Sequence, residues 1–557
     1  MSHPLPCQQT RNQPAARWDG GTAVLIAYPD GVQARGMASL EALGCALDGP
    51  LAGLFPVVHV LPFLRSSGDG GFAISDHERL EPRFGDWQDL ACLGRGRQLM
   101  ADLVLNHVSA THPWVQDALR SPGPGGAMVL ERPDGDGWEQ VVRPRSTPLF
   151  TRFHTPGGAR ELWTTFGPDQ VDVNWRNPAV LEAFVAQMDR LLAHGVRWLR
   201  LDAVGFLWKQ SHTGCIHLPQ VHDLVRVLRL LLEKRSGGTG TLVSETNVPQ
   251  AENLSYVSGG DEAHLAYNFP LPPLLLEALL SGRADLLAGW LRQWPPLPPG
   301  SGLLNFAASH DGIGLRPLEG LMPEERLQVL LEACERRGGR ISRRRQADGR
   351  ERPYELNIAW WSAMGGPGPR PDPLQLPRHL CSLLLLLALP GVPAFYLPAL
   401  LASANDQRAF ARSGHPRDLN RPRCQLSWLE RQLESPRTPA ARIAAALRRA
   451  LAVRARLPAL APDAPLTCAE TGNPALLLLQ RGRGAETLSA LHNVSASPQP
   501  LPLDLLQGCE ESEGWWEHLS GSSFDAAAHP GLAPFAVLWL QRQRPGIVAT
   551  PESGGRR

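Results

Sequence analysis

The stretch VRWLRLDAVGF, residues 196–206, ends an apolar run with an arginine and an aspartate two positions apart. Successive side chains of a β-strand point to opposite faces, so Arg200 and Asp202 share one face if this stretch is a strand. Taken alone, the stretch fits a structural ion pair at a strand end as well as it fits a pair of functional side chains. The other strand-like stretches of the chain decide between the two interpretations.

Eight apolar runs of this kind are spread over the chain, and several end in polar residues. They cover residues 23–28, 57–63, 99–107, 198–203, 241–247, 263–269, 303–311 and 391–397. Their spacing is too wide for hairpins and suits helical crossovers, which favours parallel strands. We therefore predict an α/β fold, a (β/α)8 TIM barrel, in which catalytic groups sit at the C-terminal ends of the strands.

The gaps between these runs predict the domain organisation. We expect the barrel to comprise residues 21–108 and 187–460, with an inserted subdomain at 109–186 after strand three and an inserted lid region at 312–375 after strand seven. A small C-terminal β domain is expected at 461–545, with a flexible N-terminus at 1–20 and a tail at 546–557. For the arginine-rich part of the lid, residues 336–352, a solvated loop is favoured; the alternative is a lid that brings positive charge to the active site.

Composition excludes several classes of function. The 557 residues, 43% of them hydrophobic, suffice for a large core, and a formal net charge of +1 gives no reason to expect nucleic acid or a membrane as partner. The nine cysteines show no metal-ligand spacing, which argues against a zinc site or a disulfide framework. The N-terminus has no apolar core, and the apolar run 382–397 is short and broken by prolines, so a cytoplasmic location is expected.

Four short motifs at the ends of predicted strands carry a family resemblance. ADLVLNHVS (101–109), RLDAVGFLWK (200–209), VSETN (243–247) and ASHDGIG (308–314) resemble, in this order, the motifs of the α-amylase superfamily, glycoside hydrolase family 13. RPRSTPLFTRF, PYELN and PRDLNR resemble its sucrose phosphorylase branch, and TGCIHLPQVHDL is more similar to its members that act on glucosylglycerate, glucosylglycerol or sucrose 6'-phosphate. The resemblance implies that Asp202 is a nucleophile, Glu245 a general acid and base, and Asp311 a transition-state stabiliser.

The chemistry of such a site can be stated independently. Cleavage of an α-glucoside with retention needs two carboxyl groups about 5 Å apart, one to attack the anomeric carbon and one to protonate the leaving oxygen. We expect Arg200 to keep Asp202 ionised, because a nearby cation favours the charged form of a carboxyl group. Glu245 must stay partly protonated near neutral pH, which a less polar site or a neighbouring anion would achieve.

The resemblance also implies the supporting residues. The residues expected to hold glucose are Asp69, Phe72, His107, Phe166, Gln170, Arg200, His310 and Arg421. Those expected near phosphate or the acceptor are Arg145, Lys209, Asn247, Tyr354 and Arg417. A planar guanidinium such as that of Arg145 suits phosphate because it binds two oxygens at once. No metal and no redox cofactor is implied, and inorganic phosphate is a substrate.

The acceptor is left open by departures from the branch. Asn247 stands where sucrose phosphorylase has a histidine, and Gln250 and the segment PALLASAND (398–406) also differ from the relatives that act on glucosylglycerate. Fructose, glycerate, glycerol and fructose 6-phosphate all remain candidates, with glycerate favoured. The leading hypothesis is a retaining α-glucoside phosphorylase that produces α-glucose 1-phosphate. Its alternatives are sucrose phosphorylase proper, an α-glucosidase or transglucosidase, and a non-catalytic amylase-like binding protein; a homodimer is left open.

Overall fold

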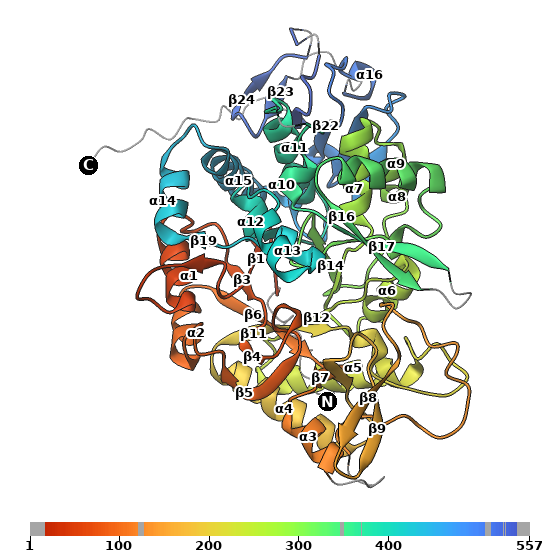
Figure 1. Ribbon diagram of the computed structural model, residues 1–557. Coiled ribbons are helices and arrows are strands. Elements are labelled where there is room, and N and C mark those ends of the chain that lie inside the picture. The colour runs from red at the N-terminus through yellow and green to blue at the C-terminus, as the bar shows by residue number, and fades with distance from the viewer. Residues whose placement is uncertain are drawn as a thin grey trace, which may run out of the picture.

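A closed barrel of eight parallel strands forms the centre of the protein (Figure 1). The computed structural model describes residues 17–120, 127–345, 350–368, 370–506, 514–526, 528–529 and 531–542. The barrel strands are β1 (Val24–Ala27), β3 (Val57–Val60), β6 (Gln98–Val104), β11 (Val196–Asp202), β12 (Thr241–Ser244), β13 (Leu265–Tyr267), β14 (Gly302–Phe306) and β18 (Val392–Tyr396). The predicted barrel is thus confirmed. Its strands are apolar almost throughout because parallel strands are buried on both faces.

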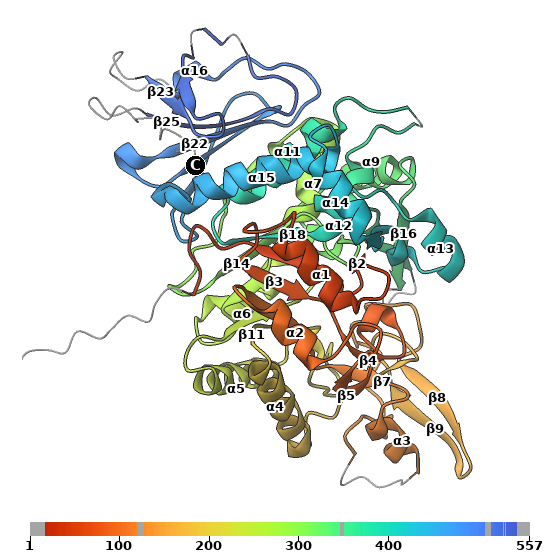
Figure 2. The same ribbon diagram turned by 90° about the vertical axis from the view of Figure 1, so that its left-hand side faces the viewer.

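Helices in the crossovers cover the outside of the barrel (Figures 1 and 2). They are α1 (Ser39–Asp48), α2 (Trp87–Leu93), α4 (Pro178–Ala193), α5 (Pro219–Arg235), α6 (Gln250–Ser258), α7 (Leu271–Ser281), α8 (Asp285–Leu291), α11 (Gln375–Ala388), α14 (Leu426–Glu434) and α15 (Pro439–Arg456). The apolar run 382–397 is divided between α11 and β18. Among the described residues, no helix combines the length and the apolar character that a membrane span requires.

The register of the barrel strands determines which side chains of the site lie next to one another. β11 pairs with β6 so that Arg200 lies opposite Asp102, and Asp202 is the last residue of β11. Glu245 directly follows β12, which pairs with β11. Because all eight strands run the same way, these residues and those that follow β14 meet at one mouth of the barrel.

The longest segment between two neighbouring barrel strands lies between β6 and β11. It contains β7 (His107–Ser109), α3 (Pro113–Arg120), the hairpin β8 (Phe150–Thr155) with β9 (Gly158–Trp163), and β10 (Gln170–Asp172). β10 pairs antiparallel with β7, with Gln170 opposite Ser109 and Asp172 opposite His107. This pairing returns the chain to the barrel mouth. A second hairpin, β4 (Leu64–Ser66) with β5 (Ile74–Leu80), follows β3.

The segment between β14 and β18 contains a three-stranded sheet of β15 (Ile313–Gly314), β16 (Arg340–Arg345) and β17 (Glu351–Asn357). The prediction of a solvated loop for the arginine-rich part is therefore wrong, because Arg340–Arg345 pairs antiparallel with β17. Residues 346–349 lie outside the described residues. In sequence, helix α9 (Glu324–Glu335) lies between β15 and β16, and α10 (Trp360–Ala363) follows β17.

A six-stranded antiparallel sheet follows the barrel, with the order β20-β21-β22-β25-β23-β24. Its strands are β20 (Leu466–Ala469), β21 (Leu476–Arg481), β22 (Leu488–Asn493), β23 (Trp515–Glu517), β24 (Ser522–Phe524) and β25 (Val537–Arg542), and α16 (Leu503–Leu506) lies between β22 and β23. The sheet lies against α11 and α15 in Figure 2. The fully buried Arg481 donates to the carbonyl of Ala388 at 2.7 Å, which joins the sheet to the end of α11.

The remaining elements complete the chain. They are β2 (Val32–Gln33), which pairs with β19 (Cys424–Gln425), and the helices α12 (Leu397–Leu400) and α13 (Gln407–Ser413). Within the proposed N-terminal segment, residues 1–16 lie outside the described residues, whereas Trp18 packs on Trp198 with ring centroids 6.2 Å apart. The proposed tail, 546–557, also lies outside the described residues.

Candidate active site

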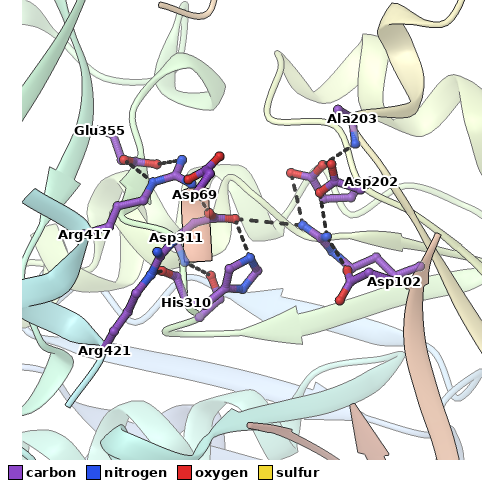
Figure 3. A network of polar contacts seen from close by, with 12 residues as sticks. Asp69, Asp102, Asp202, Ala203, His310, Asp311, Glu355, Arg417 and Arg421 are labelled. Atoms are coloured by element: carbon purple, nitrogen blue, oxygen red, sulfur yellow. Dashed lines mark hydrogen bonds and ion pairs between the residues drawn. The ribbon is translucent and has the colours of Figure 1, made fainter. Parts of the chain in front are cut away.

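A cluster of carboxylates that includes Asp102, Asp202 and Asp311 lies at the barrel mouth (Figure 3). The guanidinium of Arg200 contacts all three of them and Glu245. Its Nη1 lies 2.6 Å from Asp102 Oδ1 and 2.8 Å from Asp202 Oδ1. Its Nη2 lies 3.7 Å from Glu245 Oε1 and 3.9 Å from Asp311 Oδ2. Arg200 is only 1% exposed. Arg200 and Asp202 therefore do not form an isolated ion pair, because the buried guanidinium of Arg200 lies within 4 Å of four carboxyl groups.

Asp102 extends this cluster into the barrel interior. It is held by Arg200 on one side and by His59, whose Nε2 lies 3.0 Å from Asp102 Oδ2, on the other. Burial works to raise the pKa of Asp102, but His59 and Arg200 outweigh it and lower that pKa to about 2. Asp102 is thus a fixed anion that orients Arg200. The sequence analysis did not select it, although it lies within the quoted ADLVLNHVS.

The three proposed catalytic carboxyl groups line one cavity of about 530 Å³. Most of the other predicted site residues line the same cavity, namely Asp69, Phe72, His107, Arg145, Phe166, Gln170, Asn247, His310, Tyr354 and Arg417. The structure thus brings Asp202, Glu245 and Asp311 together from the ends of β11, β12 and β14.

Glu245 has the electrostatic setting of a general acid. Burial, followed by the negative charge of Asp311, raises its pKa, against the opposing effect of Arg200. Its Oε2 accepts a hydrogen bond of 2.9 Å from the backbone N–H of Ala203. Ala203 has a φ of 50°, so the chain turns into the left-handed region directly after Asp202 and directs this N–H at Glu245.

Asp202 shares its protonation with Glu245. Burial raises the pKa of Asp202, Arg200 opposes the rise, and the charges of Glu245, Asp102 and Asp311 add to it. The expectation that one cation suffices to keep Asp202 ionised is thus incomplete, because that cation is divided among several anions. A proton on Glu245 removes one of these repulsive charges, so the two groups titrate as a coupled pair.

Asp311 is held as an anion. Its Oδ1 lies 2.6 Å from Arg417 Nη1, and its Oδ2 lies 3.5 Å from His310 Nε2. Burial works to raise the pKa of Asp311, but Arg417 and the other nearby cations outweigh it and hold that pKa well below its usual range. Arg417 also binds Glu355 at 2.8 Å. Its positive charge, expected near phosphate, is therefore balanced by two carboxylates.

The residues expected around glucose contact one another. Gln170 Nε2 donates to Asp69 Oδ2 and to His107 Nε2, each at 3.0 Å. The ring of Phe72 stacks on His310 with centroids 5.0 Å apart and planes inclined by 9°. Burial lowers the pKa of His310 to about 3 and also lowers that of His107, so both rings are neutral and can donate or accept hydrogen bonds.

Three predicted residues do not line this cavity: Arg200, whose contacts are described above, Lys209 and Arg421. The Nζ of Lys209 lies 2.7 Å from Asp172 Oδ2, in a buried ion pair beneath the inserted segment. Arg421 Nε donates to the carbonyl of His310 at 2.9 Å, and its side chain lines a neighbouring cavity with Tyr28. Arg421 therefore supports the position of His310, and Lys209 supports the fold around Asp172.

Two of the residues expected near phosphate, Arg145 and Tyr354, lie close together in this cavity. The guanidinium carbon of Arg145 lies 5.9 Å from the centre of the Tyr354 ring. Burial raises the pKa of Tyr354, so its phenol keeps the proton that a hydrogen bond to an anion requires. The next residue, Glu355, lines the same cavity and was not selected from the sequence, although it lies in the quoted PYELN. Its role in pairing with Arg417 becomes visible only when the two segments are brought together.

Comparison with known proteins places this site in a family. Residues 54–288 match the family model of the alpha amylase catalytic domain. The chain is 39% identical to glucosylglycerate phosphorylase of Allomeiothermus silvanus, over 87% of this chain and 88% of that protein. It is 30% identical to sucrose phosphorylase of Agrobacterium vitis, over 74% of this chain and 84% of that protein.

Solved structures share the fold. The crystal structure of sucrose 6F-phosphate phosphorylase from Thermoanaerobacter thermosaccharolyticum superposes with a TM-score of 0.73, at 23% identity, covering 85% of this chain and 94% of that one. The barrel with its strand-end carboxylates and the sequence similarity over most of the chain agree. The protein belongs to glycoside hydrolase family 13, in the branch that contains the glucosylglycerate and sucrose phosphorylases.

Proposed function

We propose that the protein is a retaining phosphorylase of glucosylglycerate, which reversibly transfers glucose to inorganic phosphate and releases α-glucose 1-phosphate and glycerate. The observation that carries this proposal is the single cavity lined by Asp202, Glu245 and Asp311, with Arg145 and Tyr354 on its wall. The similarity to a relative named glucosylglycerate phosphorylase supports the choice of glycoside.

In the first step, a carboxylate oxygen of Asp202 attacks the anomeric carbon as the bond from that carbon to the leaving oxygen breaks. Glu245 donates its proton to the leaving oxygen, so the acceptor departs as a neutral hydroxyl group. Arg200 orients Asp202, and the ionised Asp311 stabilises the positive charge that develops on the sugar ring. The product of this step is a glucosyl ester of Asp202 with inverted configuration.

In the second step, a phosphate oxygen attacks the same carbon, and the ester bond to Asp202 breaks. Glu245 accepts a proton that the attacking phosphate carries, as H2PO4⁻ or HPO4²⁻, which restores the acid form of Glu245. The second inversion restores the α configuration. Arg145 and Tyr354 supply a cation and a phenolic donor for the phosphate oxygens, and an ordered phosphate beside the ester gives phosphorolysis an advantage over attack by water.

Isotope exchange tests the proposed reaction without any acceptor. The protein is incubated with α-glucose 1-phosphate and labelled inorganic phosphate, and label in the sugar phosphate is measured. A glucosyl-enzyme that phosphate can attack produces exchange, and Asp202→Asn abolishes it. A protein that releases free glucose from α-glucosides and shows no exchange would instead be a hydrolase.

A further inference from the structure

A second cavity of about 460 Å³ adjoins the one that holds the three carboxyl groups. The two cavities share Glu245, Asn247 and Tyr354 among their lining residues. Glu245 protonates the leaving oxygen in the proposed reaction, so the group that leaves must extend from Glu245 away from Asp202. The second cavity is the space that lies beside Glu245 and does not include Asp202.

Three arginines line this second cavity, and we call them the arginine cluster: Arg143, Arg316 and Arg344. They come from separate parts of the chain, the inserted segment after β6, the short helix after β15, and β16. The Nε atoms of Arg143 and Arg316 are buried without a hydrogen-bond partner. A buried N–H without a hydrogen-bond partner is costly, so an anion bound in this cavity would stabilise Arg143 and Arg316.

The charge of the cluster is only partly balanced. Arg316 Nη2 lies 3.4 Å from Glu252, and Arg344 is ion-paired with Glu319. Arg143 donates to the carbonyl of Thr147, and among the described residues it forms no ion pair with a carboxylate. While Glu245 carries its proton, these two carboxylates opposite three arginines leave one formal positive charge in the cavity wall.

His217, on the same cavity wall, adds no charge to this balance. Burial lowers the pKa of His217 to about 3, so the ring is neutral near pH 7. Its Nδ1 lies 2.8 Å from the hydroxyl of Tyr256, which fixes the ring. Gly205 makes room for it, because a Cβ at Gly205 would lie 2.8 Å from the His217 ring.

We propose that the arginine cluster binds the carboxylate of the acceptor and so determines that this enzyme uses glycerate and not a neutral polyol or a sugar. This assignment rests on the proposed function. One excess positive charge matches a monoanionic carboxylate better than the dianionic phosphate of a sugar phosphate. The carboxylate of glycerate lies only a few bonds from the oxygen that Glu245 protonates, so it reaches the adjoining cavity while that oxygen stays at Glu245.

The test compares two acceptors of similar size that differ in charge. Wild-type protein and the variants Arg316→Gln, Arg344→Gln and Arg143→Gln are given α-glucose 1-phosphate with glycerate or with glycerol, and phosphate release is measured. We expect each variant to lower kcat/KM for glycerate by about tenfold to a hundredfold, the usual effect of losing a charge-assisted hydrogen bond, and to leave glycerol nearly unchanged. Arg343→Gln is the matched control, because Arg343 lies next to Arg344 on β16 and is exposed.

Acceptor-free exchange of labelled phosphate distinguishes a failure of the proposed phosphorylase reaction from a failure of the arginine cluster assignment. If the wild-type protein shows no exchange, the proposed function itself is contradicted. Normal exchange in a variant that still prefers glycerate over glycerol as strongly as wild type overturns the arginine cluster assignment. Turnover of fructose 6-phosphate above that of glycerate in wild-type protein would overturn the choice of a carboxylate and identify the bound anion as a phosphate.

Discussion

Removal of the Arg200 guanidinium, by Arg200→Met, should destabilise the protein in a way that depends on pH. The change leaves Asp102 and Asp202 buried without the cation that lies 2.6 and 2.8 Å from them. Breaking a buried ion pair from one side costs about 3–5 kcal/mol, because a buried charge remains uncompensated. We expect a loss of that size in the free energy of unfolding at pH 7, together with loss of phosphate exchange.

The pH dependence follows from the sign of the pKa change. Without Arg200, burial raises the pKa of Asp202 in the folded variant further above its value in the unfolded chain. As pH falls from 7, the folded variant therefore takes up a proton that the unfolded chain does not, which stabilises the folded state. Each pH unit of acidification then recovers about 1.4 kcal/mol per carboxyl group that takes up a proton. The deficit relative to wild type should therefore shrink as pH falls from 7 to 5.

Urea unfolding at the two pH values measures this, with Arg481→Met as the matched control. Arg481 is also fully buried, but it donates to the carbonyls of Ala388, Ala461 and Ala464, which do not titrate. Its loss should destabilise by a similar amount at both pH values. An Arg200→Met deficit that is the same at pH 7 and pH 5 would refute the reasoning that Arg200 neutralises a group of buried carboxylates.

Further predictions concern single residues. Glu245→Gln should nearly abolish cleavage of unactivated glucosides but retain turnover of α-glucosyl fluoride, which needs no proton on its leaving group; equal losses on both would argue against an acid role. In the wild-type protein, initial rates of glucoside cleavage should fall as pH rises through the raised pKa of Glu245, and a rate that rises instead would contradict that role. Tyr354→Phe should raise the KM for phosphate about tenfold without changing hydrolysis of the glucosyl-enzyme, and an unchanged phosphate KM would remove Tyr354 from the site. Because the pKa of Asp102 is lowered to about 2, this group contributes about 2.5 kcal/mol of stability above its unfolded pKa, and that contribution should vanish as pH falls toward 2 in wild type but not in Asp102→Asn.

The barrel could be predicted because each of its strands is recognisable from a short stretch of consecutive residues. Most residues of each parallel strand are apolar, and the polar residues that follow the apolar runs, such as Asp202 and Glu245, mark the strand ends directly. Once the strands are assigned, their common direction places those residues at one mouth. The pattern of the chain therefore places Asp202, Glu245 and Asp311 at one mouth of the barrel, and the resemblance to the family implies their catalytic roles.

Other parts of the site depend on contacts between distant segments. Asp102 lies inside a strand, and nothing nearby in sequence indicates that Arg200 will lie opposite it. Glu355 acquires its role only through Arg417, which is far away along the chain. A solvated loop is the usual structure of a charged run such as 336–352. Its residues Arg340–Arg345 instead pair with β17 as a strand, and Arg344 lines a cavity.

Identification of the residue that carries glucose tests the central claim most directly. Glu245→Gln protein is incubated with α-glucosyl fluoride without phosphate, quenched in acid, digested and analysed by mass spectrometry. A mass gain of one glucosyl unit on the peptide that contains Asp202, absent from a matched Asp202→Asn double variant, is the predicted result. A glucosyl unit on another residue would contradict the account, and so would product of inverted configuration with no adduct on any peptide.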